Sequence, residues 1–179
     1  MPEIQNPQAT PHRFDQAMPS PLTFRQHVEL EYASQFIPFL KHLEKTLGRD
    51  RVIELLREFA FHGVQQFADE IVKTKGKNDL SVFKEIFSPA NPGLWNILTI
   101  QVIESTEKIF AIRVTECLLA QVFRQAGVAE LGSTALCCDA LFTRFVNPQI
   151  GLDLDGTLME GKSCCTYRWY LKPDGDDDR

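Results

Sequence analysis

Hydrophobic residues recur at steps of three and four through the first half of the chain. Over residues 24–47 this spacing defines one face of a helix. Pro38 lies inside the pattern and lacks a backbone donor, so we expect a kink or a break there. Gly48 then predicts a stop and Asp50 an N-cap, followed by a second helix that ends near Lys73.

The hydrophobic period changes from 3.6 to 2 in the second half. A short third helix, with Asp79 as its N-cap, precedes the change. Apolar and polar residues then alternate over 98–102 and again over 110–114, and the short polar turn between them predicts an antiparallel hairpin. Thr115 ends the second strand in this interpretation, and a helix over residues 116–126 follows.

Two further strands are predicted near the C-terminus. The region before them is less clear, and a short helix over residues 139–146 is one interpretation. Alternation then returns twice, the second time over 164–171, where Cys165 and Tyr167 face one side and Arg168 the other. Together these elements predict an α+β fold in which N-terminal helices pack on a four-stranded, mainly antiparallel sheet.

Composition divides the chain into three parts. Five prolines among Gln, Asn and Ser in residues 1–21 predict an extended or disordered arm, because such a segment buries too little apolar surface to offset its ordering entropy. Residues 22–173 are predicted to form a single domain, for which a chain of 179 residues is of ordinary length. Four aspartates in residues 174–179 predict a solvated acidic tail.

Charge and hydropathy narrow the possible partners. The formal net charge is -5, and no basic stripe exists to replace the counterions of a nucleic acid. No apolar run reaches the roughly 18 residues of a membrane span, and no secretory signal opens the chain. We therefore expect a soluble, cytoplasmic protein that binds neither nucleic acid nor membrane.

Five cysteines form an odd set, Cys117 and the vicinal pairs Cys137–Cys138 and Cys164–Cys165. Neighbouring cysteines rarely bond to each other, and the spacing lacks the C-x-x-C of zinc sites. Free thiols in a reducing compartment are therefore expected, and no metal or cofactor is implied. A disulfide between the two pairs is the alternative.

Glu116 and Cys165 are candidates for catalysis. Glu116 falls at the edge of the apolar stripe of its predicted helix, where a partly desolvated carboxylate suits a general acid or base. The alternative is an anion that is simply favoured in a first helical turn. Cys165 is a candidate nucleophile, or else a small buried apolar residue, and all four histidines lie far away in the first 62 residues.

Arg168 is a candidate for binding a substrate carboxylate through its forked guanidinium. Strand alternation places Arg168 opposite Cys165 unless the strand bulges or ends there, and an ion pair with an acidic residue such as Asp153 is equally open. Asn147, which precedes a proline, indicates a turn first, and Asp139 indicates a helix cap first.

The order of these residues is more specific than any one of them. Over about residues 110–170 the chain resembles the L-2-amino-thiazoline-4-carboxylic acid hydrolase family, in the segments Thr115-Glu116-Cys117, Phe123-Arg124-x-x-Gly127, Asp139, Asn147-Pro148-x-Ile150, Thr157-Leu158-Met159-x-Gly161 and Cys165-x-x-Arg168. The resemblance implies a hydrolase that opens a five-membered C=N–S ring of a small carboxylate substrate.

The resemblance also implies roles for individual residues. Glu116 or Asp139 would protonate the ring nitrogen, and Cys165 would attack if the reaction has a covalent intermediate. Arg168 would hold the substrate carboxylate. Asn147 would orient the water or the amidine nitrogen.

Thr157 and Tyr167 would contact the substrate from the same motifs. Tyr167 is also where the chain departs from the family, which usually has Cys-Asp-His-Arg or Cys-Asn-His-Arg at residues 165–168. A tyrosine titrates at about pH 10 and is a poor base at neutrality, although it can donate a hydrogen bond. The departure leaves open another substrate, different chemistry, or binding alone.

Two alternatives to a hydrolase remain. Helices followed by a sheet with a late cysteine-containing strand are also similar to ligand-sensing domains of the 4-vinyl reductase type, which predicts binding without catalysis. The phenylalanine-rich helices would also suit an interaction module that forms a homodimer.

Overall fold

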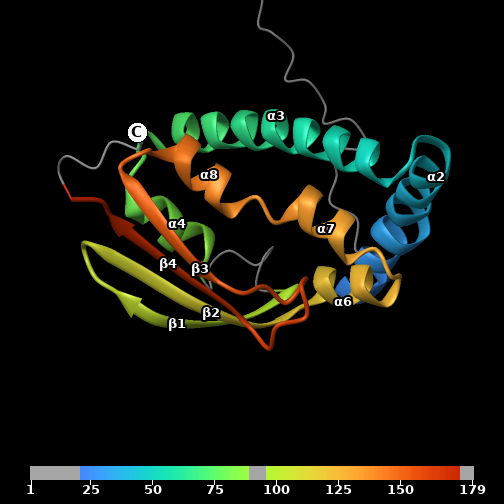
Figure 1. The fold of residues 1–179 in the computed structure, drawn as a ribbon. Helices are drawn as coiled ribbons and strands as arrows, with labels where there is room; N and C mark the ends of the chain where they lie inside the picture. Colours follow the sequence, from blue (N-terminus) through green and yellow to red (C-terminus); the bar gives the residue numbers. More distant parts are fainter. Residues whose placement is uncertain (1–20, 89–95, 174–179) are drawn as a thin grey trace, which may run out of the picture.

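The computed structural model describes residues 21–88 and 96–173 (Figure 1). The predicted acidic tail and all but the last residue of the predicted arm lie outside these ranges. The first helices are α1 (Phe24–Val28), the π-helix η2 (Glu29–Phe36), α2 (Ile37–Leu47), α3 (Arg49–Lys75) and α4 (Leu80–Ile86). The later elements are β1 (Leu98–Ser105), β2 (Ile109–Cys117), α6 (Leu118–Gln125), α7 (Ala129–Leu136), α8 (Asp139–Val146), β3 (Ile150–Asp155) and β4 (Cys165–Leu171).

The four strands form one sheet in the order β1-β2-β4-β3, with every neighbouring pair antiparallel. Helices α7 and α8 run across one side of this sheet, and the long α3 lies outside them (Figure 1). Helix α4 contacts β2 and β4. The predicted α+β class and four-stranded sheet are confirmed. Within the described ranges, no helix combines the length and apolar character needed to cross a membrane.

Two clusters of buried side chains hold the layers together. One surrounds Phe123, where α2, α3, α6 and α7 meet. The other surrounds Trp169 of β4, whose ring packs against Phe83, Phe110 and Tyr167 at centroid distances of 5.2, 5.7 and 5.4 Å. Aromatic rings bury large apolar areas, so this second cluster fixes the inner face of β4 against the helices.

A kink or a break was expected at Pro38, and the break is wrong, because helical backbone continues from α1 through η2 into α2. The turn before the proline is wider than an α-turn: the Ile37 N–H donates to the carbonyl of Tyr32, five residues earlier. Pro38 then falls in the first turn of α2, where a missing donor costs little. Gly48 ends α2 as predicted, and this glycine, not Asp50, is the N-cap residue of α3.

Strand β2 continues through Glu116, where the sequence predicts the start of a helix. Thr99 of β1 pairs with Glu116, but the next residue, Ile100, pairs with Val114. Thr115 is therefore an extra residue on β2 and forms a β-bulge. A bulge reverses the in-and-out alternation of the side chains that follow it. The end of β2 consequently presents the opposite set of side chains from the one that regular alternation predicts.

Candidate functional site

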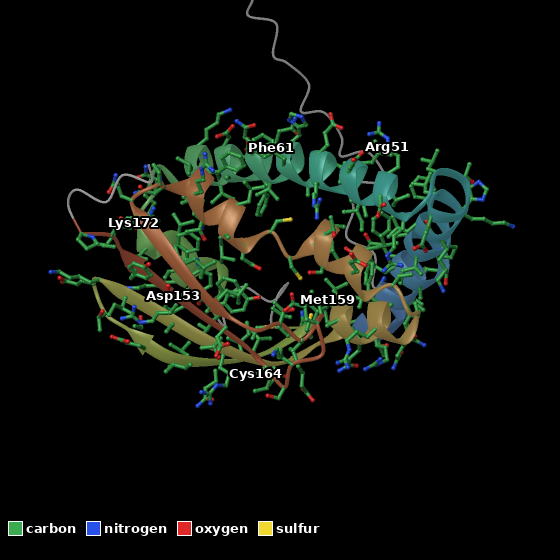
Figure 2. All side chains as sticks on the ribbon, in the orientation of Figure 1. Arg51, Phe61, Asp153, Met159, Cys164 and Lys172 are labelled. Carbon is green, nitrogen blue, oxygen red and sulfur yellow. The ribbon has the colours of Figure 1, made fainter. Side chains whose placement is uncertain are left out.

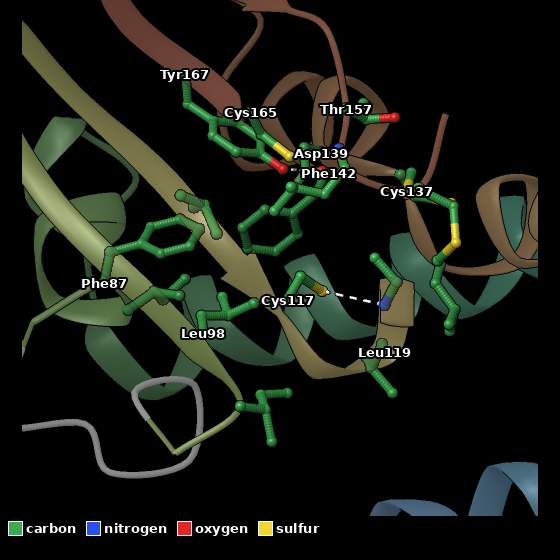
Figure 3. Close-up of a pocket in the computed structure, with 18 of the residues that line it drawn as sticks. Phe87, Leu98, Cys117, Leu119, Cys137, Asp139, Phe142, Thr157, Cys165 and Tyr167 are labelled. Carbon is green, nitrogen blue, oxygen red and sulfur yellow. Dashed lines mark hydrogen bonds between the residues drawn. The ribbon is translucent and has the colours of Figure 1, made fainter. Parts of the chain in front are cut away.

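A cavity of about 530 Å³ lies between the inner face of the sheet and helices α3, α4 and α8 (Figure 3). Most of its wall is apolar, with aromatic rings from Phe87, Phe142, Tyr167 and Trp169. Its polar groups come mainly from the α7–α8 connection and the start of β4. A cavity of this volume and lining suits a small organic molecule that has one polar end.

Asp139 begins α8 and lies beside Tyr167 on the cavity wall (Figure 3). The Tyr167 hydroxyl donates to Oδ2 of Asp139 at 3.5 Å. Burial raises the pKa of Asp139 to about 6, because the loss of water outweighs the hydrogen bonds from its own backbone N–H and from Tyr167. Asp139 therefore changes its protonation state close to neutral pH, as an acid–base catalyst must.

Tyr167 is the second polar residue at this end of the cavity. It lies on β4, and its hydroxyl points toward Asp139 (Figure 3). Burial raises the pKa of Tyr167 above its ordinary value, and the negative charge of Asp139 raises it further. Tyr167 is consequently a hydrogen-bond donor at neutral pH and not a base.

Four thiols line the cavity, those of Cys117, Cys137, Cys138 and Cys165. Cys165 is buried, and its sulfur accepts a hydrogen bond from the Leu158 N–H at 3.2 Å. Burial raises the pKa of Cys165, and it raises the pKa of Cys137 to about 12. All five cysteines of the chain are described and free, so the prediction of free thiols is confirmed. With these raised pKa values, the thiols of Cys137 and Cys165 are protonated at neutral pH, and any attack by Cys165 requires a base.

Thr157 is buried in the same wall. Its hydroxyl donates to the Glu160 carboxylate at 2.9 Å and accepts a hydrogen bond from the Glu160 N–H at 3.1 Å. These bonds close the turn before β4. Thr157 therefore shapes the wall, and its hydroxyl is already engaged.

Glu116 lies outside the cavity. Its side chain is exposed, and a threonine hydroxyl of β1 donates to its carboxylate at 2.6 Å. The bulge at Thr115 explains this position, because it places Val114 and Cys117 on the cavity wall and leaves Glu116 out. The expectation of a partly desolvated carboxylate in a helical first turn is wrong. Asp139 is the carboxylate that the fold brings to the polar end of the cavity.

Arg168 and Asn147 also lie away from the cavity lining. Nη1 of Arg168 is 3.9 Å from Oδ2 of Asp153, and the guanidinium lies 5.6 Å from the centroid of the Tyr170 ring. Arg168 therefore forms the ion pair that was the alternative to binding a substrate carboxylate, and this pair lies on the outer face of the sheet. The Asn147 amide donates to the Asn78 carbonyl at 2.9 Å, and its side-chain oxygen accepts a hydrogen bond from the Gln149 N–H at 2.8 Å in a turn, as its position before a proline first indicated.

The contribution of Cys117, Cys137 and Cys138 to the wall was not predicted. The signal available for the last two was a vicinal pair directly before Asp139, at the junction of α7 and α8. In the ranges that the structure describes, no three His, Cys, Asp or Glu side chains gather in a group that could hold a metal ion.

Comparison with known proteins places this site in a family. The sequence model of L-2-amino-thiazoline-4-carboxylic acid hydrolase matches residues 28–169, which include the helical first half as well as the cavity-lining segments. The chain belongs to this hydrolase family. No curated protein matches it.

Solved structures show where the fold occurs elsewhere. The phenol-responsive sensory domain of the transcription activator PoxR, solved with phenol, superposes with a TM-score of 0.52 at 14% sequence identity, covering 78% of this chain and 74% of that one. A trafficking protein particle complex subunit 3 from Naegleria fowleri, covalently bound to palmitic acid, gives a TM-score of 0.47 at 12% identity, covering 83% of this chain and 95% of that one.

Proposed function

We propose that this family member hydrolyses a C=N bond in a small ring-containing molecule bound in the cavity, with Asp139 as the acid–base group. The observation that carries the proposal is a carboxyl group with a pKa of about 6 on the wall of a predominantly apolar cavity, hydrogen bonded to Tyr167. Buried groups that titrate near neutrality are a common mark of catalytic sites.

The proposed chemistry uses one carboxyl group twice. Ionised Asp139 takes a proton from water as the water oxygen bonds to the C=N carbon, and the C=N electron pair moves to the ring nitrogen. Asp139 returns that proton to the ring nitrogen. As the C–O bond becomes C=O, Asp139 carries the remaining hydroxyl proton to the ring atom that leaves the tetrahedral carbon. Tyr167 acts as a positioning residue, because its hydroxyl donates to Oδ2 of Asp139.

Cys165 offers a second route through the same base. Asp139 would take the thiol proton and give it to the ring nitrogen as the sulfur adds across the C=N bond. A ring atom would then leave that carbon and take up a proton through Asp139 as a C=N bond re-forms, and water would replace the Cys165 sulfur, which regains its proton. The raised pKa of Cys165, which arises mainly from burial, makes this transfer necessary. In both routes Asp139 supplies the base that the sequence leaves unidentified.

A ring-opening assay with 2-amino-2-thiazoline and its 4-carboxylate tests the proposal. Asp139→Asn should lower the rate by at least about a hundredfold, the usual contribution of a general acid–base group. Cys165→Ala distinguishes the routes, since it abolishes the covalent one and spares direct attack by water. Cys164→Ala is the matched control, because Cys164 lies at the outer side of the sheet (Figure 2). An Asp139→Asn protein that retains its fold and its rate would overturn the proposal.

Binding without chemistry is the second candidate. Its support is the predominantly apolar wall together with protonated thiols, which suit holding a ring more than attacking it. The PoxR sensory domain, which shares the fold, was solved with phenol. Saturable binding of ring compounds with no turnover in wild-type protein would favour this candidate.

A further inference from the structure

The charged groups on the cavity wall are few. Among the described residues that line it, the charged side chains are Lys75, Glu85 and Asp139. Lys75 Nζ lies 2.7 Å from Oε2 of Glu85, and Lys77 bonds the other oxygen of the same carboxylate. Two ammonium groups therefore share Glu85 at this edge of the cavity, and Lys75 is already paired.

Arg168, the cationic side chain predicted to hold a substrate carboxylate, lies outside the cavity lining. Arg168 lies beside Asp153 on the outer face of the sheet, because alternation along β4 turns it away from Cys165. A ligand carboxylate beside Asp139 would meet a like charge there, since Lys75, the described cation on the wall, is paired with Glu85.

The polar end of the cavity suits the opposite charge. Asp139 keeps acceptor capacity beyond its bond to Tyr167, because an ionised carboxylate has about four lone-pair sites. A planar amidinium offers two parallel N–H donors that match the two carboxylate oxygens. The rings of Phe87 and Phe142 provide the apolar wall against which a flat ring can pack.

From these contacts we infer that the cavity takes flat ring compounds that carry a cationic amidine-type group and no carboxylate. The inference rests on the proposed function in treating this cavity as the substrate site. It separates this chain from the carboxylate substrate in the name of its family, because the cavity lacks an unpaired partner for that carboxylate among its described residues.

Binding of three probes with the same ring tests the inference independently of turnover. 2-Naphthamidine, 2-naphthamide and 2-naphthoate differ in charge at nearly constant size, and isothermal titration calorimetry at pH 7.5 gives a Kd for each. The amidine should bind at least about tenfold more tightly than the naphthoate, with the amide between them, because a buried carboxylate discriminates strongly by charge. Asp139→Asn should reduce the difference between amidine and amide to less than about threefold.

Several results would overturn the inference. Naphthoate binding as tightly as naphthamidine would do so while leaving the proposed hydrolysis standing. An amidine preference that survives Asp139→Asn, or naphthoate binding that Arg168→Gln removes, would show that other residues set the charge selectivity. If none of the three probes binds, the cavity is not a ring site and the proposed function fails with it. If the amidine preference holds but no ring compound is hydrolysed, only the proposed function fails.

Discussion

The indole N–H of Trp169 on β4 donates a buried hydrogen bond to the hydroxyl of Thr143 on α8, at 2.9 Å. The Thr143 hydroxyl in turn donates to the backbone carbonyl of Asp139 at 2.7 Å. Two consecutive bonds thus connect the centre of the sheet to the first residue of α8. Because Asp139 carries the proposed acid–base role, this chain of bonds anchors the backbone from which its carboxylate extends.

Thr143→Val should destabilise the fold by about 1 to 3 kcal/mol, because it leaves the buried indole N–H of Trp169 without an acceptor. Urea denaturation monitored by circular dichroism measures the loss. Thr134→Val is the matched control: the Thr134 hydroxyl also donates to a carbonyl four residues earlier, that of Glu130, but accepts no bond from an indole. Equal losses in the two variants would contradict the importance of the Trp169 bond.

Asp139→Asn should stabilise the protein at neutral pH and leave it nearly unchanged near pH 3. Asp139 holds its proton up to a pH of about 6 in the folded chain, whereas the unperturbed pKa is 3.8. Between these values the unfolded chain loses the proton first, so the wild type loses stability as the pH rises, by about 2 to 3 kcal/mol in all.

Free energies of unfolding for the wild type and Asp139→Asn, measured from pH 3 to pH 8, give the pH-dependent loss of stability directly. The titratable groups around Asp139 are Tyr167 and four thiols, and burial raises the pKa of each, so they remain protonated across this range; the thiols are those of Cys117, Cys137, Cys138 and Cys165. Asp153→Asn on the outer face serves as the control and should show no such trend. Parallel pH profiles for wild type and Asp139→Asn would contradict the prediction.

Tyr167→Phe and Tyr167→His should move the titration of Asp139 in opposite directions. Loss of the Tyr167 hydroxyl removes a hydrogen bond that lowers the pKa of Asp139, so Phe raises that pKa further. A protonated His would lower it through charge attraction. The pH dependence of naphthamidine binding reports the midpoint in each variant, and an unchanged midpoint in both would argue against a contact between residues 139 and 167.

Iodoacetamide at pH 7 should label Cys164 much faster than Cys165. Cys165 is buried and burial raises its pKa, whereas Cys164 is partly exposed on the opposite side of the strand. Mass spectrometry of Cys164→Ser and Cys165→Ser proteins resolves the adjacent sites. All remaining cysteines should label in denaturant, and rapid native labelling of Cys165 would indicate an activated thiol.

Much of the fold followed from periodicity. The alternation around Ile112 and Trp169 predicted two strands of the sheet and their inner faces, and Asp79 capped α4 as expected. The sequence did not predict α7, whose eight residues include a glycine that packs against Phe123. It also did not predict the π-helical turn before Pro38, since that turn depends on a one-residue change in hydrogen bonding.

The candidate site was predicted in part, and the reasons differ by residue. Asp139, Cys165 and Tyr167 line the cavity as the motif order suggested. The outward position of Arg168 follows from strand parity, which the sequence already indicated. Glu116 could not have been placed, because a bulge is a feature of pairing between two strands and leaves no local signature in either one.

The bulge at Thr115 makes the chemistry of the cavity wall depend on strand pairing as well as residue type. If the same residues paired without the bulge, strict alternation would exchange a thiol for a carboxylate on the inner surface without any substitution. Deleting Thr115 would instead close the bulge and keep Cys117 on the inner surface and Glu116 on the outer one. A relative of this chain that has one residue fewer at this point would therefore keep the same groups on the cavity wall, and a comparison of aligned residue identities would record the change only as a gap.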